Sequence, residues 1–234
     1  MKKKIMASLL VGSAVVGASL APLSAQAVTT GNTPVQVEFG GGTLPNHDSD
    51  VINVDPDPNA SNTDFDLLAI PKNLNFSPVK IGEDLSAIRL LTAENRSVMV
   101  GDLRGTKEGW HHVTGEISGM TNGAEQLEGT IRIAPRTVYA RYIISAGTGL
   151  YITETSQNGI NIVDNPAAPV SNEVNLKIGG GASTLMSASA GKGQGTWAGR
   201  LEGERLNVTT PMQQLKKGAY TGNITWNLVA GPSI

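Results

Sequence analysis

The segment from Tyr220 to Val229 alternates apolar and polar residues more regularly than other parts of the chain. One set of alternate positions holds the apolar residues Tyr220, Ile224, Trp226 and Leu228, and the other holds the polar residues Thr221, Asn223, Thr225 and Asn227. A period of two is typical of a β-strand with one buried face. The pattern therefore constrains this part of the chain to a half-buried β-strand.

From Leu67 onward the chain alternates short β-type runs with turn signals of glycine, asparagine and proline, as in Thr121-Asn122-Gly123. Many short strands with regular turn signals indicate a sandwich or a barrel. No sustained helical period occurs, and Pro211 and Gly218 limit Gln213–Lys217 to a single turn. The sequence therefore predicts an all-β fold, a β-sandwich of immunoglobulin-like or related Greek-key arrangement. The expected strands are Ala87–Thr92, Ser97–Leu103, Trp110–Ile117, Leu127–Ile133, Val138–Ile144, Gly159–Val163, Glu173–Ile178, Ser183–Ala188, Gly195–Leu201, Asn207–Thr210 and Ala219–Val229.

The first 27 residues have the pattern of a secretory signal peptide. Three lysines precede an apolar stretch from Ile5 to Leu20, and Ala25-Gln26-Ala27 is a small-residue cleavage signal. The alternative is an N-terminal membrane anchor, for which the apolar run is short and rich in glycine and serine. The chain has no cysteine, which excludes a lipoprotein and any disulfide. We expect the mature chain, from Val28, to contain no membrane span.

Residues 28–66 have a linker-like composition, which predicts an irregular N-terminal segment ahead of a β domain over residues 67–234. The acidic residues of this segment include Asp48, Asp50, Asp55, Asp57, Asp64 and Asp66. A calcium loop is the functional alternative, but the central glycine and the terminal glutamate of such a loop are absent from this spacing.

Charge and motifs argue against most catalytic and nucleic-acid functions. Cleavage after residue 27 would remove three lysines and move the formal net charge from −2 to −5, which is unsuited to binding phosphate backbones. His111 and His112 are adjacent, so in a regular strand they would point to opposite faces and share no metal. No Gly-x-Ser-x-Gly elbow occurs. We therefore expect no enzyme activity, no metal and no cofactor. The alternative is a wall hydrolase that pairs Glu116 with Glu125 or Glu128.

Three tryptophans, Trp110, Trp197 and Trp226, lie on expected strands. A tryptophan brings a large apolar area to a core that is poor in phenylalanine, and alternation favours this role for Trp197 and Trp226. The functional alternative is a flat aromatic surface on which sugar rings stack. For Trp110 the two roles stay open, because Gly109 precedes it and two histidines follow it.

Several segments resemble, in the same order, the motifs of the WxL-domain surface proteins of low-GC Gram-positive bacteria. They are Leu74-Asn75-Phe76, the run Ser97–Gly105 followed by Gly109-Trp110, Gly193-Gln194-Gly195-Thr196-Trp197, and the run Lys216–Leu228. The likeness covers residues 66–234, and the order of the motifs makes it specific. One departure is His112, which stands where the family has leucine.

The resemblance implies a secreted, non-catalytic protein that is attached to the bacterial cell wall without a covalent anchor, through peptidoglycan. It also implies partnership with other cell-surface proteins that carry membrane or sorting anchors. A partner-binding subunit without direct wall affinity is the alternative. The residues expected to contact a ligand are Trp110, His111, His112, Trp226 and Leu228.

Overall fold

The computed structural model describes residues 34–45, 54–56, 63–145 and 147–231. The expected signal peptide, residues 1–27, lies outside these residues, as do Asp48, Asp50 and Asp57 of the acidic segment. Pro34–Glu38 is extended chain without regular secondary structure, and all of its residues are exposed. From Phe39 onward the described residues form one compact unit that contains every described strand. Apart from two short 3₁₀ turns, its regular structure is entirely β.

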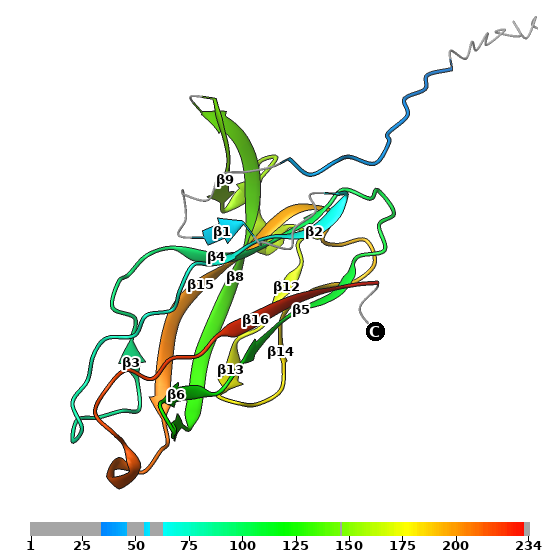
Figure 1. Cartoon of the computed structure of the whole chain (residues 1–234). Coiled ribbons are helices and arrows are strands. Elements are labelled where there is room, and N and C mark those ends of the chain that lie inside the picture. Colours follow the sequence, from blue (N-terminus) through cyan, green and yellow to red (C-terminus); the bar gives the residue numbers. More distant parts are fainter. Residues whose placement is uncertain (1–33, 46–53, 57–62, 146, 232–234) are drawn as a thin grey trace, which may run out of the picture. The chain divides into compact units, whose positions relative to one another are not determined.

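The larger sheet has eight strands, which pair in the order β1-β2-β4-β15-β8-β13, with β3 added to β15 and β9 added to β8 (Figure 1). Every pairing is antiparallel. The strands are β1 (Val54–Pro56), β2 (Phe65–Pro71), β3 (Ile88–Arg89), β4 (Arg96–Asp102), β8 (Gly129–Ser145), β9 (Thr148–Glu154), β13 (Val174–Lys177) and β15 (Gly195–Val208).

The smaller sheet has four strands in the order β12-β14-β5-β16, so that β16 forms one edge. Its strands are β5 (Trp110–Ile117), β12 (Val170–Ser171), β14 (Ser183–Ala188) and β16 (Ile224–Ala230). Two short hairpins and two 3₁₀ turns complete the described fold. They are β6 (Met120–Asn122) with β7 (Glu125–Leu127), β10 (Ser156–Gln157) with β11 (Ile160–Asn161), η1 (Ile162–Asp164) and η2 (Met212–Gln214).

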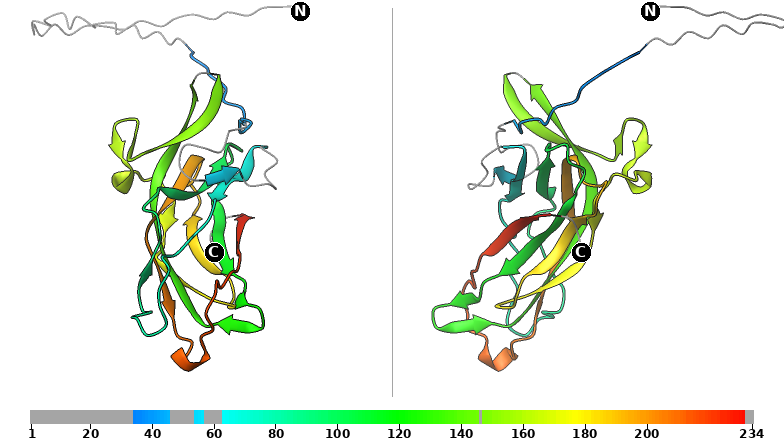
Figure 2. Two further views of the ribbon diagram at one scale, coloured as in Figure 1. Left: turned by 60° about the vertical axis from the view of Figure 1, so that its left-hand side comes forward. Right: turned by 90° about the vertical axis from the view of Figure 1, so that its right-hand side faces the viewer.

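The main core lies between the two sheets, which the two views of Figure 2 show as separate layers. Val98 and Val100 of β4 and Ile133 of β8 enter it from the larger sheet, and Val113 of β5 and Leu185 of β14 enter it from the smaller sheet. All five side chains are almost completely buried. Two stacked sheets with interdigitating side chains form a sandwich, and the prediction of an all-β fold of this kind is confirmed.

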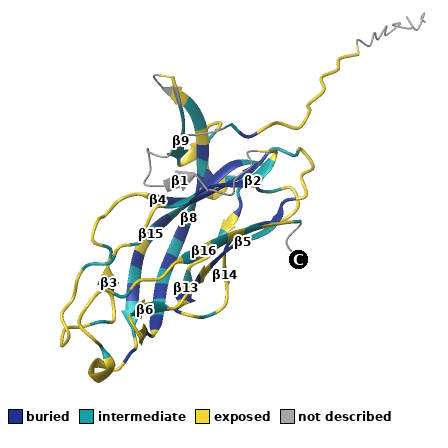
Figure 3. Cartoon of the chain, in the orientation of Figure 1, coloured by how far each residue is buried: buried dark blue, intermediate teal, exposed yellow. Residues whose placement is uncertain are grey.

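A second core covers the opposite face of the larger sheet at one end. It contains Leu68 of β2, Met99 of β4, Val138 of β8 and Tyr151 of β9, together with Leu44 from the chain before β1. Successive residues of a strand point to opposite faces, so β4 contributes Val98 and Val100 to one core and Met99 to the other. Strand β4 is consequently buried at every position, as the dark blue ribbon in Figure 3 shows.

Two pairs of predicted strands are each one continuous strand. Leu127–Ile133 and Val138–Ile144 merge into β8, and Gly195–Leu201 and Asn207–Thr210 merge into β15. On one side of β8 the neighbouring strand changes from β13 to β9, and Pro135 lies between these two pairings. No strand on that side therefore needs a hydrogen bond from the N–H that proline lacks. Gly203 marks a register shift in β15, where its φ of 64° suits a bulge. Both residues lie in gaps between expected strands, but the strands continue through them.

Other strands differ from the prediction mainly in length. The expected strand Ala87–Thr92 is reduced to the two residues of β3, and Ala219–Val229 begins later, at Ile224. Strands β2 and β9 were not predicted, nor were the short strands β1, β6, β7, β10 and β12. The expected strand Gly159–Val163 is reduced to β11, because Ile162 and Val163 belong to the 3₁₀ turn η1. Because β2 supplies side chains to both cores, its sequence Phe65-Asp66-Leu67-Leu68-Ala69-Ile70-Pro71 lacks a period of two. The single turn expected within Gln213–Lys217 is present as η2.

Candidate functional site

A hollow among the described residues has a volume of about 890 Å³ and lies beside the 3₁₀ turn η2. Two segments line it, which we call its first wall, from Leu74 to Ile81, and its second wall, from Leu215 to Thr221. The other lining residues are Leu85, Ile88, Met120, Leu127, Leu206 and Val208. We call this hollow the basic groove, because its lining includes Lys80, Lys216 and Lys217 but no aspartate or glutamate.

The first wall of the groove is held by backbone bonds to the chain around β3. The amide of Ser77 donates to the carbonyl of Arg89 over 2.8 Å, and the amide of Leu91 donates to the carbonyl of Asn75 over 2.8 Å. Arg96, whose side chain is buried, donates through Nε to the carbonyl of Asn73 at the start of this wall. A buried guanidinium with several acceptors fixes the loop that it contacts.

The second wall is fixed by local bonds to residues of its own and to β6. The amide of Lys216 donates to the hydroxyl oxygen of Tyr220 over 3.0 Å. The side-chain amide of Asn122 donates to the carbonyls of Lys216 and Lys217. Thr121 and Thr221 exchange two backbone bonds. The positions of both lysines along the groove are thereby set, while their side chains remain exposed.

A smaller hollow of about 360 Å³ adjoins the basic groove, since the two share Leu74, Asn75, Phe76 and Met120 as lining residues. Trp226 lines this smaller hollow together with Ile224 of the same strand. Its ring is half-buried and packs against the main core, where its edge faces Gly115 of β5. Trp226 therefore has one face for packing and one that borders an open space.

Both hollows are thus lined by the last motif of the chain, whose run from Leu215 to Trp226 forms a wall of each. The sequence model of the WxL domain, a surface cell wall-binding domain, matches residues 26–232. The chain belongs to the WxL family. No curated protein and no solved structure matches it.

The Trp-x-Leu tripeptide in this WxL domain is Trp226-Asn227-Leu228. Trp226 and Leu228 lie on β16 opposite Gly115 and Val113 of β5, and both are half-buried against the core. Leu228 does not line either hollow. Among the residues expected to contact a ligand, only Trp226 therefore lines one of these two hollows. Residues 74–76 and 216–221 of the two walls belong to the motif matches, but no pattern in the sequence indicates that these segments enclose a hollow.

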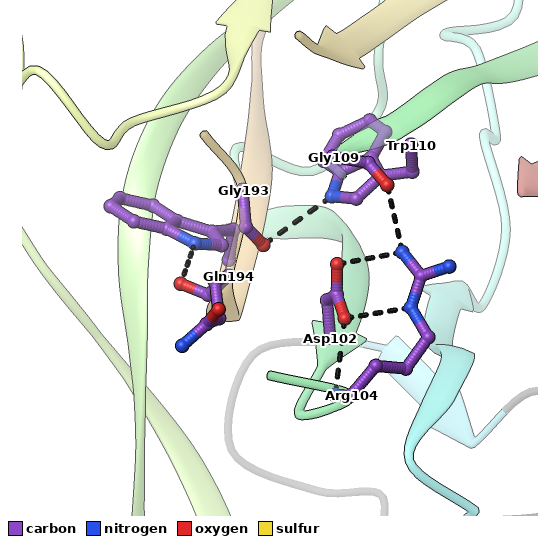
Figure 4. Close-up of polar contacts among 7 residues, drawn as sticks. Asp102, Arg104, Gly109, Trp110, Gly193 and Gln194 are labelled. Atoms are coloured by element: carbon purple, nitrogen blue, oxygen red, sulfur yellow. Dashed lines mark hydrogen bonds and ion pairs between the residues drawn. The ribbon is translucent and has the colours of Figure 1, made fainter. Parts of the chain in front are cut away.

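The other two tryptophans of the WxL domain are fully buried. The indole Nε1 of Trp110 donates to the carbonyl of Gly193, and that of Trp197 donates to the carbonyl of Gln194 (Figure 4). Gly193 has a φ of 76°, and a Cβ at this position would lie 2.5 Å from Nε1 of Trp110, so only glycine fits. The expected ligand contact of Trp110 is thus replaced by packing, because this conformation offers no face of its ring to a ligand.

An ion pair closes the loop between β4 and β5 of the WxL domain. Arg104 binds the buried carboxylate of Asp102 through Nε and through the terminal nitrogen Nη2. Nη2 also donates to the carbonyl of Gly109 over 2.7 Å. Its guanidinium also lies 4.0 Å from the ring centre of Phe65. Figure 4 shows how this arginine joins the end of β4 to the residue before Trp110.

His111 and His112 lie closer together than a regular strand allows. Their ring centres are 4.1 Å apart. In the pairing of β5 with β14, Trp110 and Val113 are matched to Ala188 and Met186, so β5 carries an extra residue at the histidines. Such a bulge re-aims side chains, which corrects the expectation of opposite faces. Within the described residues, no group of three or more histidine, aspartate or glutamate side chains could hold a metal.

The stability of the WxL domain is expected to fall as pH drops below about 6.5, in part through His112. Burial, and secondarily the charge of His111, lowers the pKa of His112 from its ordinary value of 6.5. The folded state thus favours the neutral ring. The stability that this ring contributes is complete above pH 6.5, and it is lost as the pH falls through the pKa that His112 has in the folded state. Calorimetric melting from pH 8 to pH 5 should show a shallower slope for His112→Gln than for the wild type. Identical slopes would contradict this role of the ring.

The three carboxylates considered for a hydrolase lie at separate places along the chain. Glu116 lies on β5, Glu125 on β7, and Glu128 between β7 and β8, and all three are exposed. A general acid of a glycosidase usually has an apolar surrounding that keeps its carboxyl protonated.

Among the residues described by the structure, no helix has the length and apolar character to cross a membrane.

Proposed function

We propose that this chain is a secreted, non-catalytic surface protein that attaches non-covalently to peptidoglycan through the basic groove. Its family gives it a cell wall-binding surface domain. One observation supports the groove as the contact: two segments that match family motifs, one with Phe76 and the other with Tyr220, line the same open hollow. An open cleft lined by aromatic and apolar residues with a few fixed polar groups is the common form of a binding site.

Direct wall attachment is tested by sedimentation of the mature protein with purified, protein-free cell walls. The protein should pellet with the walls at physiological salt and be released by a chaotrope without lysozyme. Recovery of the protein in the supernatant would overturn direct attachment. A turbidity assay on the same walls should show no clearance, and clearance would overturn the non-catalytic assignment.

Replacement of Ile81 by aspartate should weaken sedimentation with walls at least tenfold without lowering the melting temperature. The side chain of Ile81 lines the groove and is 51% exposed, so an acidic group there would oppose an apolar or anionic ligand without disturbing the core. Ile160→Asp is the matched control, because Ile160 is 46% exposed and lies on β11, outside both hollows. Equal wall binding by the two variants would remove the groove from the contact.

A second candidate function is that of a subunit in a complex of surface proteins, without wall affinity of its own. The hairpin of β8 and β9 favours it, because its end extends past the neighbouring strands (Figure 1) and carries Ile144 with 73% of its side chain exposed. Exposed apolar residues on a projection are typical of protein contacts. Co-elution with an anchored surface protein in gel filtration, weakened by Ile144→Asp, would support this function.

A further inference from the structure

We infer that the basic groove recognises the carboxylate-bearing stem peptide of peptidoglycan and not its glycan strand. This inference rests on the proposed function and names the part of the polymer that the groove takes. It is carried by three features of the groove: lysines without partners, a largely apolar lining, and few polar side chains that are free to bind sugar hydroxyls.

The three groove lysines are cations without partners in the described part of the chain. Lys80, Lys216 and Lys217 take part in none of the described ion pairs, each of which uses an arginine. With no aspartate or glutamate among the lining residues, the groove concentrates positive charge in a chain whose net charge is negative. A cleft lined by charge of one sign attracts ligands of the opposite sign.

The lining between these lysines is mainly apolar. Phe76, Val79, Ile81 and Leu215 face the hollow together with the ring of Tyr220. Val79 and Ile81 are 42% and 51% exposed, so a ligand that covers them removes apolar surface from water. The groove therefore suits a ligand that joins carboxylate groups to methyl and methylene groups.

Polar side chains that could bind sugar hydroxyls are few and partly engaged. The hydroxyl of Tyr220 accepts the amide of Lys216, and the hydroxyl of Ser77 donates to the carbonyl of Leu90. Asn75 and Thr221 supply the remaining uncharged polar side chains of the lining. A polymer of hydroxylated rings needs many directed hydrogen bonds to replace those it makes with water, and this lining offers few.

The glycan strand and the stem peptides of peptidoglycan differ in the chemical groups that they present. Its glycan strand presents hydroxyls and neutral acetamido groups, whereas its stem peptides present carboxylates and alanine methyl groups, together with the amine of a diamino acid. The volume of about 890 Å³ lies in the range of pockets that enclose a molecule of several residues. The lysines on the two walls lie within the lining of one hollow, so a short peptide can reach cations on both walls.

The test compares the intact protein on three wall preparations: untreated walls, walls stripped of stem peptides by an amidase, and walls freed of phosphate polymers by hydrofluoric acid. Binding to the first and third but not to the second is the expected result. Equal binding to amidase-treated walls would overturn the peptide assignment and leave wall attachment intact. Loss of binding after the acid treatment would assign the lysines to phosphate polymers instead. No binding to any preparation would refute the proposed function itself.

A soluble probe tests the site directly. Titration calorimetry with the peptide L-alanyl-γ-D-glutamyl-L-lysyl-D-alanyl-D-alanine should show binding that weakens with added salt. The double variant Lys216→Glu with Lys217→Glu should weaken it at least tenfold, and Lys80→Glu on the opposite wall should also weaken it. The control is Lys107→Glu with Lys177→Glu, since both lysines are exposed and lie outside the groove lining. Unchanged affinity in the groove variants, with an unchanged melting temperature, would overturn the inference.

Discussion

Replacing Trp110 by alanine is expected to destabilise the domain by about 3–5 kcal/mol, the range for removal of a buried aromatic side chain. The indole is fully buried between the two sheets and donates to the carbonyl of Gly193, on the chain that leads into β15. Its removal leaves a cavity and an unpaired carbonyl at once. Urea unfolding followed by circular dichroism measures the change, and wall binding should be lost only to the extent that the protein unfolds.

Trp226→Ala is the matched control for this experiment. Its ring is half-buried at the edge strand β16, so the loss of stability should be clearly smaller. A Trp110→Ala protein that keeps its melting temperature but no longer binds walls would contradict the assignment of Trp110 to the core. It would mean that the indole becomes accessible to a ligand in solution.

Replacing Arg104 by alanine is expected to cost about 3 kcal/mol, because it leaves the carboxylate of Asp102 buried without its cation. The side chain of Asp102 is 4% exposed and that of Arg104 is 16% exposed. The substitution also removes the bond to the carbonyl of Gly109 and the contact with the ring of Phe65. The loop that leads into Trp110 should loosen, which hydrogen exchange of its amides would detect.

Arg132→Ala provides the comparison, since Arg132 pairs with Glu173 in the same two-bonded geometry at the surface. Those side chains are 38% and 52% exposed. Exposed ion pairs contribute little to stability, so the melting temperature should hardly change. Equal losses in Arg104→Ala and Arg132→Ala would show that burial of the pair at Asp102 does not determine its effect.

Two strands of the smaller sheet were predictable from the sequence with their bounds. Trp110–Ile117 and Ser183–Ala188 were predicted with their observed bounds, because turn residues lie before and after each of them. Strand β2 was not predicted, since burial on both faces removes the alternation on which such a prediction depends. The strands that continue through Pro135 and Gly203 were each predicted as two strands, because a local sequence does not show which neighbour pairs with each residue.

The candidate site was less predictable than the fold. The motif residues that form its walls, such as Phe76 and Tyr220, could be recognised, but their closeness depends on the packing of segments far apart in the chain. The bulge at His111 and His112 likewise follows from pairing with β14 and β16, which no spacing rule reveals. The burial of Trp110 could not be decided because glycine and histidine neighbours fit a strand and a surface site equally well.

The pairing of β4 with β15 brings together residues from the two halves of the chain, for example Val100 and Trp197. A sheet whose centre is closed by such distant partners forms slowly, because the loop between them must be ordered before the contact stabilises it. Neither half of the domain can complete this sheet alone. A newly made chain would therefore stay unfolded until the segment that contains β15 has been synthesised and can be ordered beside β4.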